Sequence, residues 1–133
     1  MAEKTFRCTV ITPNRQVLDK DVAAAVIPAW DGEVGLLKQR APLLCKLGFG
    51  TMRLTSDNGS SEQYYVGGGF AQMKDDNLTL LTDEAIPVDQ INVEEVRAAL
   101  KEAEAFSPQD AVQAQRRSRD LARAKAMLKA AGH

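Results

Sequence analysis

Up to about residue 87, the apolar residues occur in short runs that are typical of β-strands. In residues 5–11, Phe6, Cys8 and Val10 alternate with polar side chains, which is the period of a strand with one buried face. Further runs follow, separated by glycine, proline, Asn-Gly and Asp-rich turn signals. They are residues 23–28, 33–37, 43–47, 51–55, 62–66, 70–74 and 77–81. Because no helical period separates them, the pattern predicts an antiparallel β-sandwich of about ten short strands.

After Pro87 the apolar spacing changes to that of α-helices. Val93, Val96, Leu100 and Ala103 recur at helical spacing, and Asn92 precedes Glu95 by three residues, as in an N-terminal cap. The sequence Phe-Ser-Pro at 106–108 interrupts this helix, and Ser107 is predicted to cap a second helix with Pro108 at its first position and Asp110 in its first turn. Two helices joined so closely should form an antiparallel hairpin.

The predicted fold is therefore α+β, with a β-sandwich domain at residues 1–87 and a helical hairpin domain at residues 88–133. In the second helix, the positions expected to form the contact stripe are mostly small or polar. Burial of such side chains stabilises a helix less than burial of large apolar ones, so we expect weak anchoring of this helix. The stripe is Ala111, Ala114, Ser118, Leu121, Lys125 and Leu128.

Charge and hydropathy narrow the function classes. The chain of 133 residues has a net charge of -1, but residues 108–133 contain six basic and two acidic side chains. That segment has no aromatic residue on which a base could stack, so nucleic acid is not expected as a partner. No run approaches the about 18–20 apolar residues that span a bilayer, and the first residues lack a signal-peptide pattern, so a cytosol-like compartment without direct bilayer insertion is expected.

Motifs for catalysis are missing from the sequence. There is no phosphate-binding GxxxxGK[ST], no GxGxxG and no HExxH, and the only histidine is His133. We therefore expect a non-catalytic protein without a cofactor or metal ion. The Gly-Gly-Gly at 67–69 is predicted to mark a bulge or a close backbone approach, because a strand and not a helix follows it. Cys8 and Cys45 are predicted to be buried reduced thiols, and Asp75-Asp76 and Asp83-Glu84 to be solvated turn residues.

The basic segment of the second helix leaves two interpretations open. Arg116, Arg119 and Arg123 fall on one helix face because they are spaced by three and four residues. This face is either a solvated surface or a contact for an acidic surface of another protein.

The order of motifs resembles the epsilon subunit of F-type ATP synthases of the bacterial and plastid kind. The resemblance extends from about Phe6 to Met127. Its most specific parts are Gly32-Glu33-x-Gly35 followed by Ala-Pro-Leu-Leu at 41–44, and Gly68-Gly69-Phe70 followed by LTLLTDEA at 78–85. Both blocks precede the predicted helical hairpin in the expected order.

The resemblance implies a rotor subunit of the central stalk, which couples the catalytic head to the c-ring of a proton- or ion-translocating complex. In this family the sandwich packs against the gamma subunit and sits on the c-ring. The hairpin either folds against the sandwich or extends toward the alpha and beta subunits and inhibits ATP hydrolysis. The implied location is peripheral, on the cytoplasmic face of the bacterial inner membrane or the stromal face of the thylakoid.

Residue by residue, the resemblance assigns the c-ring interface to Asp31, Gly32, Glu33, Lys38 and Arg40. Family members commonly have Pro-Gly-His or Pro-Asn-His where this chain has Lys-Gln-Arg at 38–40. The arginine stays charged at all physiological pH values, whereas histidine need not. The inhibitory contact with the catalytic head is assigned to a basic set on the second helix: Arg116, Arg117, Arg119 and Arg123.

An alternative function is an ATP-sensing module that binds nucleotide between the hairpin helices. Relatives that do so carry Ile/Leu-Asp-x-x-Arg-Ala, but here Asn92 replaces the Asp and Glu95 occupies the Arg position. Arg97 comes two residues later, and two residues turn a helical side chain by about 200°, so no ATP site is expected. A ligand-binding sandwich of the cupin or lectin kind is a third possibility, but the sequence lacks the pocket residues or metal ligands that it needs.

Overall fold

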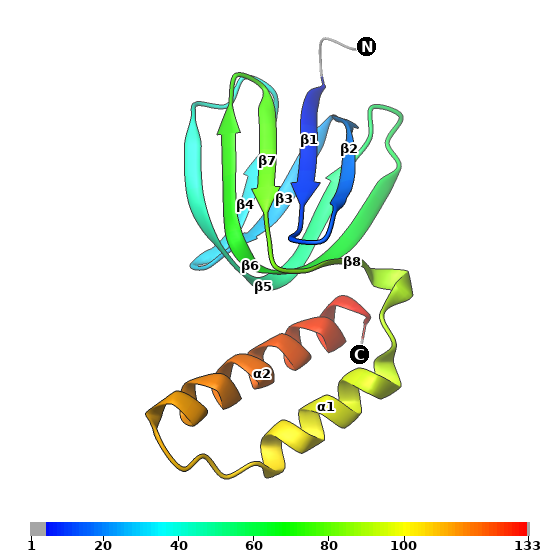
Figure 1. Cartoon of the computed structure of the whole chain (residues 1–133). Helices are drawn as coiled ribbons and strands as arrows, with labels where there is room; N and C mark the ends of the chain where they lie inside the picture. The colour runs from blue at the N-terminus through cyan, green and yellow to red at the C-terminus, as the bar shows by residue number, and fades with distance from the viewer. Residues whose placement is uncertain (1–4, 133) are drawn as a thin grey trace.

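The structure is a computed structural model and describes residues 5–132 (Figure 1). A β-sandwich occupies one end of the molecule, and two antiparallel helices lie beneath it, with α2 nearer the strands. The strands are β1 (Phe6–Ile11), β2 (Gln16–Val22), β3 (Ala24–Ala29), β4 (Gly32–Leu36), β5 (Leu43–Thr55), β6 (Ser61–Lys74), β7 (Asn77–Leu81) and β8 (Ala85–Pro87). The helical part consists of the 3-10 turn η2 (Val88–Gln90) and the helices α1 (Val93–Ala105) and α2 (Ala111–Ala130).

The two layers of the sandwich share the long strands β5 and β6. The strand order is β2-β1-β7-β6-β5-β3-β4, and β8 also pairs with β6. The second half of β6 pairs with β7, whereas its first half pairs with β8. Both long strands bend where they pass from one layer to the other, above the helices (Figure 1). All pairings are antiparallel except that of β1 with β7, which is parallel.

The α+β class and the sandwich are confirmed, but the predicted number of about ten strands is wrong. Within residues 5–132 the chain forms eight strands, because glycines taken as strand boundaries lie inside strands. Gly48 lies within β5 and the triple glycine lies within β6, so each pair of predicted runs is one long strand. β2 and β8 were not predicted, since β2 is rich in charged residues and β8 has only three residues.

The triple glycine permits the close backbone approach that was predicted. Gly69 has φ = 103°, and a Cβ atom there would lie 2.0 Å from the carbonyl oxygen of Leu81 and 2.7 Å from Cα of Thr82. Only a residue without a side chain fits at this distance, so β6 bends directly against the end of β7.

The main core lies between the two layers and is entirely apolar apart from Cys8. It contains Phe6, Val10, Ile27, Leu54 and Met73, among other buried residues. Cys8 and Cys45 are free thiols, as predicted, but only Cys8 is fully buried and Cys45 is half-buried. Burial raises the pKa of the Cys8 thiol to about 12, so this thiol is protonated at neutral pH.

The first helix begins and packs as the sequence predicts. The Asn92 side chain accepts a hydrogen bond from the backbone N–H of Glu95 (3.1 Å). Val96 is buried, while Val93, Leu100 and Ala103 are half-buried on the same face. The predicted cap and contact stripe of α1 are therefore confirmed.

The second helix begins three residues later than predicted. Asp110, not Ser107, is the capping residue, and its Oδ1 accepts a hydrogen bond from the backbone N–H of Gln113 (2.8 Å). An extended Asp110 backbone (φ = -153°) separates the helix from Pro108. Aspartate caps a helix as well as serine does, and sequence spacing alone did not distinguish the two positions.

The contact face of α2 also differs from the prediction. Ala111, Ala114, Ser118 and Lys125 are exposed, and only Leu121 and Leu128 of the predicted stripe are half-buried. The buried residues of α2 are Ala124 and Met127. The helix is thus rotated relative to the predicted stripe, and it packs mainly through its C-terminal half.

Candidate functional site

The helical hairpin docks on the sandwich through a second, smaller apolar cluster. Tyr65 of β6 is fully buried against Val96 of α1 and against Ala124 and Met127 of α2. Its hydroxyl has no hydrogen-bond partner within residues 5–132, and burial raises the Tyr65 pKa above its usual range. A buried hydroxyl without a partner lowers the stability of the docked arrangement, because it gives up hydration without replacement.

Two ion pairs fasten α2 to the segment between β7 and β8. Arg123 donates from Nε to Glu84 Oε1 (2.5 Å) and from Nη2 to Oε2 (2.7 Å). Arg119 donates from Nη2 to Asp83 Oδ2 (3.2 Å). The pair of parallel bonds keeps the pKa of Arg123 above its ordinary value. Asp83 is exposed in its turn, as predicted, although it pairs with Arg119. The prediction is wrong for Glu84, because this residue is half-buried and holds Arg123 through two hydrogen bonds.

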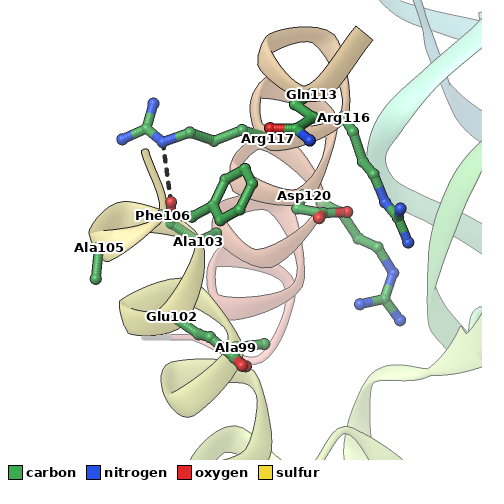
Figure 2. A pocket seen from close by; sticks show the side chains of 10 residues that line it. Ala99, Glu102, Ala103, Ala105, Phe106, Gln113, Arg116, Arg117 and Asp120 are labelled. Atoms are coloured by element: carbon green, nitrogen blue, oxygen red, sulfur yellow. Dashed lines mark hydrogen bonds between the residues drawn. The ribbon is translucent and has the colours of Figure 1, made fainter. Parts of the chain in front are cut away.

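The four arginines predicted to contact a catalytic head have different environments in the docked hairpin. Arg117 donates to the C-terminal carbonyls of α1, from Nε to Ala103 O (3.0 Å; Figure 2) and from Nη2 to Glu104 O (3.2 Å). These two bonds tie the helices together. Arg116 is exposed beside the groove between the helices. In the docked hairpin, two of the four guanidinium groups therefore bind the sandwich, that of Arg117 binds α1 within the hairpin, and that of Arg116 stays accessible.

The groove between the helices does not have the features of a phosphate site. It has a volume of about 650 Å³, and its lining includes three arginines and two carboxylates: Arg116, Arg117, Arg123, Glu102 and Asp120 (Figure 2). Two of the arginines are already bound, Arg117 to the end of α1 and Arg123 to Glu84. The two carboxylates oppose binding of a phosphate chain. Within residues 5–132, no three His, Cys, Asp or Glu side chains are grouped as metal ligands would be. His133 lies outside the described residues.

The degraded nucleotide motif lines a second, smaller groove. Asn92 and Glu95 lie there together with Arg123, but the Asn92 side chain caps α1 and Arg123 is bound to Glu84. Among the described residues, Arg123 is the one basic side chain that lines this groove, and it is already paired with Glu84.

We expect no useful ATP binding by the isolated chain. Isothermal titration calorimetry with MgATP should give no binding heat at micromolar concentrations, because Glu95 adds a carboxylate where a phosphate would have to bind. The Glu95→Arg variant is the matched comparison, since it restores the cation of the motif. Binding of ATP to the unchanged chain at nanomolar-to-micromolar concentrations would contradict this prediction.

The residues predicted to face a c-ring fall into two groups at opposite ends of β4. Asp31, Gly32 and Glu33 belong to the turn from β3 into β4, whereas Lys38 and Arg40 belong to the connection from β4 to β5. β4 has five residues, so about 17 Å of strand separates the groups. The structure does not bring the five residues together in one loop.

Each group has its own neighbours. Gly32 and Glu33 line a groove together with Lys125 and Lys129 from the last turns of α2. The Lys-Gln-Arg segment at 38–40 lies beside the turn between β6 and β7, because the Gln39 backbone N–H donates a hydrogen bond to Asp76 Oδ1 (2.7 Å). One group is thus on the hairpin side and the other is at the opposite end of the sandwich (Figure 1).

An apolar patch on the outer face of the β2-β1-β7-β6-β5 layer was not predicted from the sequence. Register places Lys46 of β5, Phe70 of β6, Leu81 of β7 and Ile11 of β1 side by side. We call this patch the outer apolar face and define it by its exposed members in the strands, Leu44 (72% exposed), Phe70 (55%) and Leu81 (54%), together with Trp30 (70%). Trp30 lies in the turn between β3 and β4, and its backbone N–H donates to Lys46 O of β5 (2.9 Å) at the edge of the patch.

The outer apolar face could have been found from the strand alternation, once the strand limits were known. Core positions of β6 at Ala71 and Met73 place Phe70 on the opposite face, and the core position Leu80 does the same for Leu81. Exposed apolar side chains that are contiguous on one face mark a protein contact more often than scattered ones do. No helix within residues 5–132 is both long and apolar enough to cross a bilayer.

Comparison with known proteins identifies the family. Residues 5–88 match the family model of the β-sandwich domain of the ATP synthase delta/epsilon chain. The chain is 40% identical over 126 residues to the ATP synthase epsilon chain of Rhodopirellula baltica, covering 95% of this chain and 98% of the relative. It is 37% identical over 93 residues to the "ATP synthase epsilon chain, sodium ion specific" of Propionigenium modestum, covering 70% of this chain and 67% of the relative.

A solved structure gives the same result. A chain in the cryo-EM structure of the Euglena gracilis mitochondrial ATP synthase, OSCP/F1/c-ring, superposes with a TM-score of 0.85 and 30% identity, covering 98% of this chain and 82% of that chain. Both the strands and the helical hairpin are included in a match of this extent. The chain therefore belongs to the ATP synthase epsilon chain family.

Proposed function

We propose that this chain is the central-stalk epsilon subunit of an F-type ATP synthase, which couples the catalytic head to the c-ring through the gamma subunit. Family membership supports this function, and the observation that carries it is the outer apolar face. Four exposed large apolar side chains on one side of a sandwich are typical of a surface that a partner protein covers. The similar Euglena chain belongs to a complex that contains F1 and a c-ring.

The outer apolar face is our proposed contact for gamma. The hairpin covers the opposite layer of the sandwich through Tyr65 and Ile86, so the outer face stays uncovered in the docked arrangement. Aromatic residues such as Trp30 and Phe70 supply large apolar areas and are the residue types enriched at the centres of protein interfaces.

Phe70→Glu is expected to weaken binding to gamma by at least about thirtyfold, because a charge at the centre of an apolar contact loses its hydration. Phe70 is 55% exposed, so the fold should tolerate the change. The measurement is co-purification of the full chain with gamma, followed by a titration of the two purified proteins.

Val112→Glu is the matched control, since Val112 is a similarly exposed apolar residue on α2 and lies outside the proposed contact. Binding to gamma should be unchanged in this variant. If Phe70→Glu bound gamma as tightly as the unchanged chain, the outer apolar face would not be the gamma contact.

For the c-ring contact, we propose the loop at residues 37–42 as the centre. This loop lies at the end of the sandwich opposite the hairpin (Figure 1). It carries Lys38 and Arg40, whose charges suit polar or acidic loops of a ring. Asp31, Gly32 and Glu33 join the same contact only if it extends along the length of β4. The translocated ion, whether a proton or another cation, is a property of the ring.

The hairpin, residues 88–133, is proposed to act as a separate inhibitory domain. When the hairpin leaves the sandwich, Arg119 and Arg123 lose their partners Asp83 and Glu84. Arg117 loses Ala103 and Glu104 when the two helices also separate from each other. Together with Arg116 they can then pair with acidic residues of the alpha and beta subunits and block ATP hydrolysis. The same guanidinium groups serve both arrangements, so docking and head contact exclude each other. The proposed location is the membrane face that carries the catalytic head.

A further inference from the structure

Three described residues other than glycine adopt positive φ, and all three belong to one small region. They are Gln39 (φ = 66°), Asp75 (φ = 52°) and Asp76 (φ = 59°). Asp75 and Asp76 form the two-residue turn between β6 and β7, and Gln39 lies in the loop between β4 and β5. Residues other than glycine rarely adopt positive φ, so this backbone conformation persists only where the surrounding structure enforces it.

One hydrogen bond joins these residues. The Gln39 backbone N–H donates to Asp76 Oδ1 (2.7 Å), across 37 positions of sequence. Gln39 and Asp75 are exposed and Asp76 is half-buried, so burial in a core does not enforce the conformation. The carboxylate of Asp76 accepts the hydrogen bond from the loop. A hydrogen bond to a charged acceptor is stronger than one between neutral groups.

Asp76 is itself fixed to the sandwich. Its carbonyl oxygen accepts a hydrogen bond from the backbone N–H of Arg7 (3.0 Å) at the start of β1. The adjoining turn is closed by the pairing of Lys74 with Asn77, and the Asn77 side chain donates to the carbonyl of Asp75 (2.9 Å). Asp76 therefore links the loop at 37–42 to the rigid part of the fold.

We propose that Asp76 is a positioning residue that holds the loop at residues 37–42 in a binding-ready conformation. This loop carries Leu37, which is 64% exposed, together with Lys38 and Arg40. Fixing the Gln39 backbone between the two cations limits the directions in which they extend, so less conformational entropy is lost when a partner binds. The partner is the polar loop surface of the c-ring, and in this respect the inference rests on the function proposed above.

The Asp76→Gly variant removes the carboxylate and keeps the positive φ without strain. Asp76→Asn keeps an acceptor oxygen at the same place and should rescue the contact. Asp75→Gly is the matched control, because it removes the neighbouring carboxylate of the same turn but leaves the bond to Gln39 intact.

The first measurement is hydrogen exchange of the Gln39 backbone amide in the isolated full chain, followed by NMR. Asp76→Gly should increase its exchange rate by about tenfold or more, while Asp76→Asn and Asp75→Gly should remain near the unchanged chain. Thermal midpoints recorded in parallel should be similar for all variants. An unchanged exchange rate in Asp76→Gly would overturn the positioning role, whatever the chain binds.

The second measurement is binding of the full chain, in complex with gamma, to purified c-ring. Asp76→Gly should weaken binding by about threefold to tenfold, and Asp76→Asn should restore it. Faster exchange at Gln39 with unchanged affinity would overturn the contribution to ring binding. Failure of the unchanged chain to bind the ring would instead contradict the proposed function, while the exchange experiment would still decide the role of Asp76.

Discussion

Replacing Gly69 with alanine is expected to lower the free energy of unfolding by about 3–5 kcal/mol, the sum of backbone overlap and strain at positive φ. The added Cβ would lie 2.0 Å from Leu81 O and 2.7 Å from Thr82 Cα, and backbone atoms cannot rotate away as a side chain can. Because domains are stable by only about 5–15 kcal/mol, the thermal midpoint should fall by more than about 10 °C. Urea unfolding followed by circular dichroism measures the change.

Gly59→Ala separates the two causes of this effect. Gly59 also has positive φ (89°), but a Cβ atom there would meet no atom within 4 Å. Its substitution should therefore cost only the conformational term, about 1–2 kcal/mol. Equal destabilisation by the two variants would show that the close approach of β6 to β7 does not determine the cost at Gly69.

Removal of α2 by truncation after Phe106 is expected to raise ATP hydrolysis by the assembled complex. If the four arginines contribute roughly 0.5 kcal/mol each to the blocked state, their loss removes about 2 kcal/mol, or roughly a thirtyfold shift in its population. Steady-state hydrolysis by the complex reconstituted with full-length or truncated chain measures the effect. Unchanged activity would contradict inhibition by the hairpin and leave the coupling role intact.

Glu84→Gln tests the same mechanism in the opposite direction and keeps every arginine. The substitution removes the charge that binds Arg123, and the pair is only about one-third exposed (side chains 37% and 29%), so the docked hairpin should be weakened measurably. Hydrolysis should then fall, because more of the hairpin population is free to reach the catalytic head.

Asp89→Asn is the control for charge alone, as Asp89 is an exposed carboxylate five residues further along the chain. It should leave hydrolysis unchanged. If Glu84→Gln raised the rate, the ion pair with Arg123 would not be what keeps the hairpin docked.

The sequence predicted the kinds of elements better than their limits. Alternation of Phe6, Cys8 and Val10 identified β1, and the Asn92 cap placed the start of α1 correctly. Gly48 and the triple glycine were misleading, because glycine marks both the end of a strand and a bend inside one. The two cases differ in whether another strand packs directly against the glycine, and a single sequence does not show which strands become neighbours.

The candidate site was predictable only in part, because its contacts join distant segments. The arginines of α2 and the carboxylates of Asp83 and Glu84 were both noted, but their pairing depends on how the hairpin docks. The outer apolar face needs the register of four strands before its members become neighbours. The resemblance grouped Asp31 and Arg40 by their nearness in sequence, although β4 separates them in space.

The bend shared by β5 and β6 would have a mechanical consequence in the proposed rotor role. β5 starts directly after the loop at 37–42 and runs without interruption to the bend. At the bend, Phe49 packs in the apolar cluster that docks the hairpin on the sandwich. A torque applied at that loop would travel along one continuous strand, with no loop in between. The most compliant point on this path is the bend itself, where Gly48 of β5 leaves the backbone without a side chain. In the proposed rotor role, strain from such a torque would therefore concentrate at the bend, next to the contact that holds the hairpin.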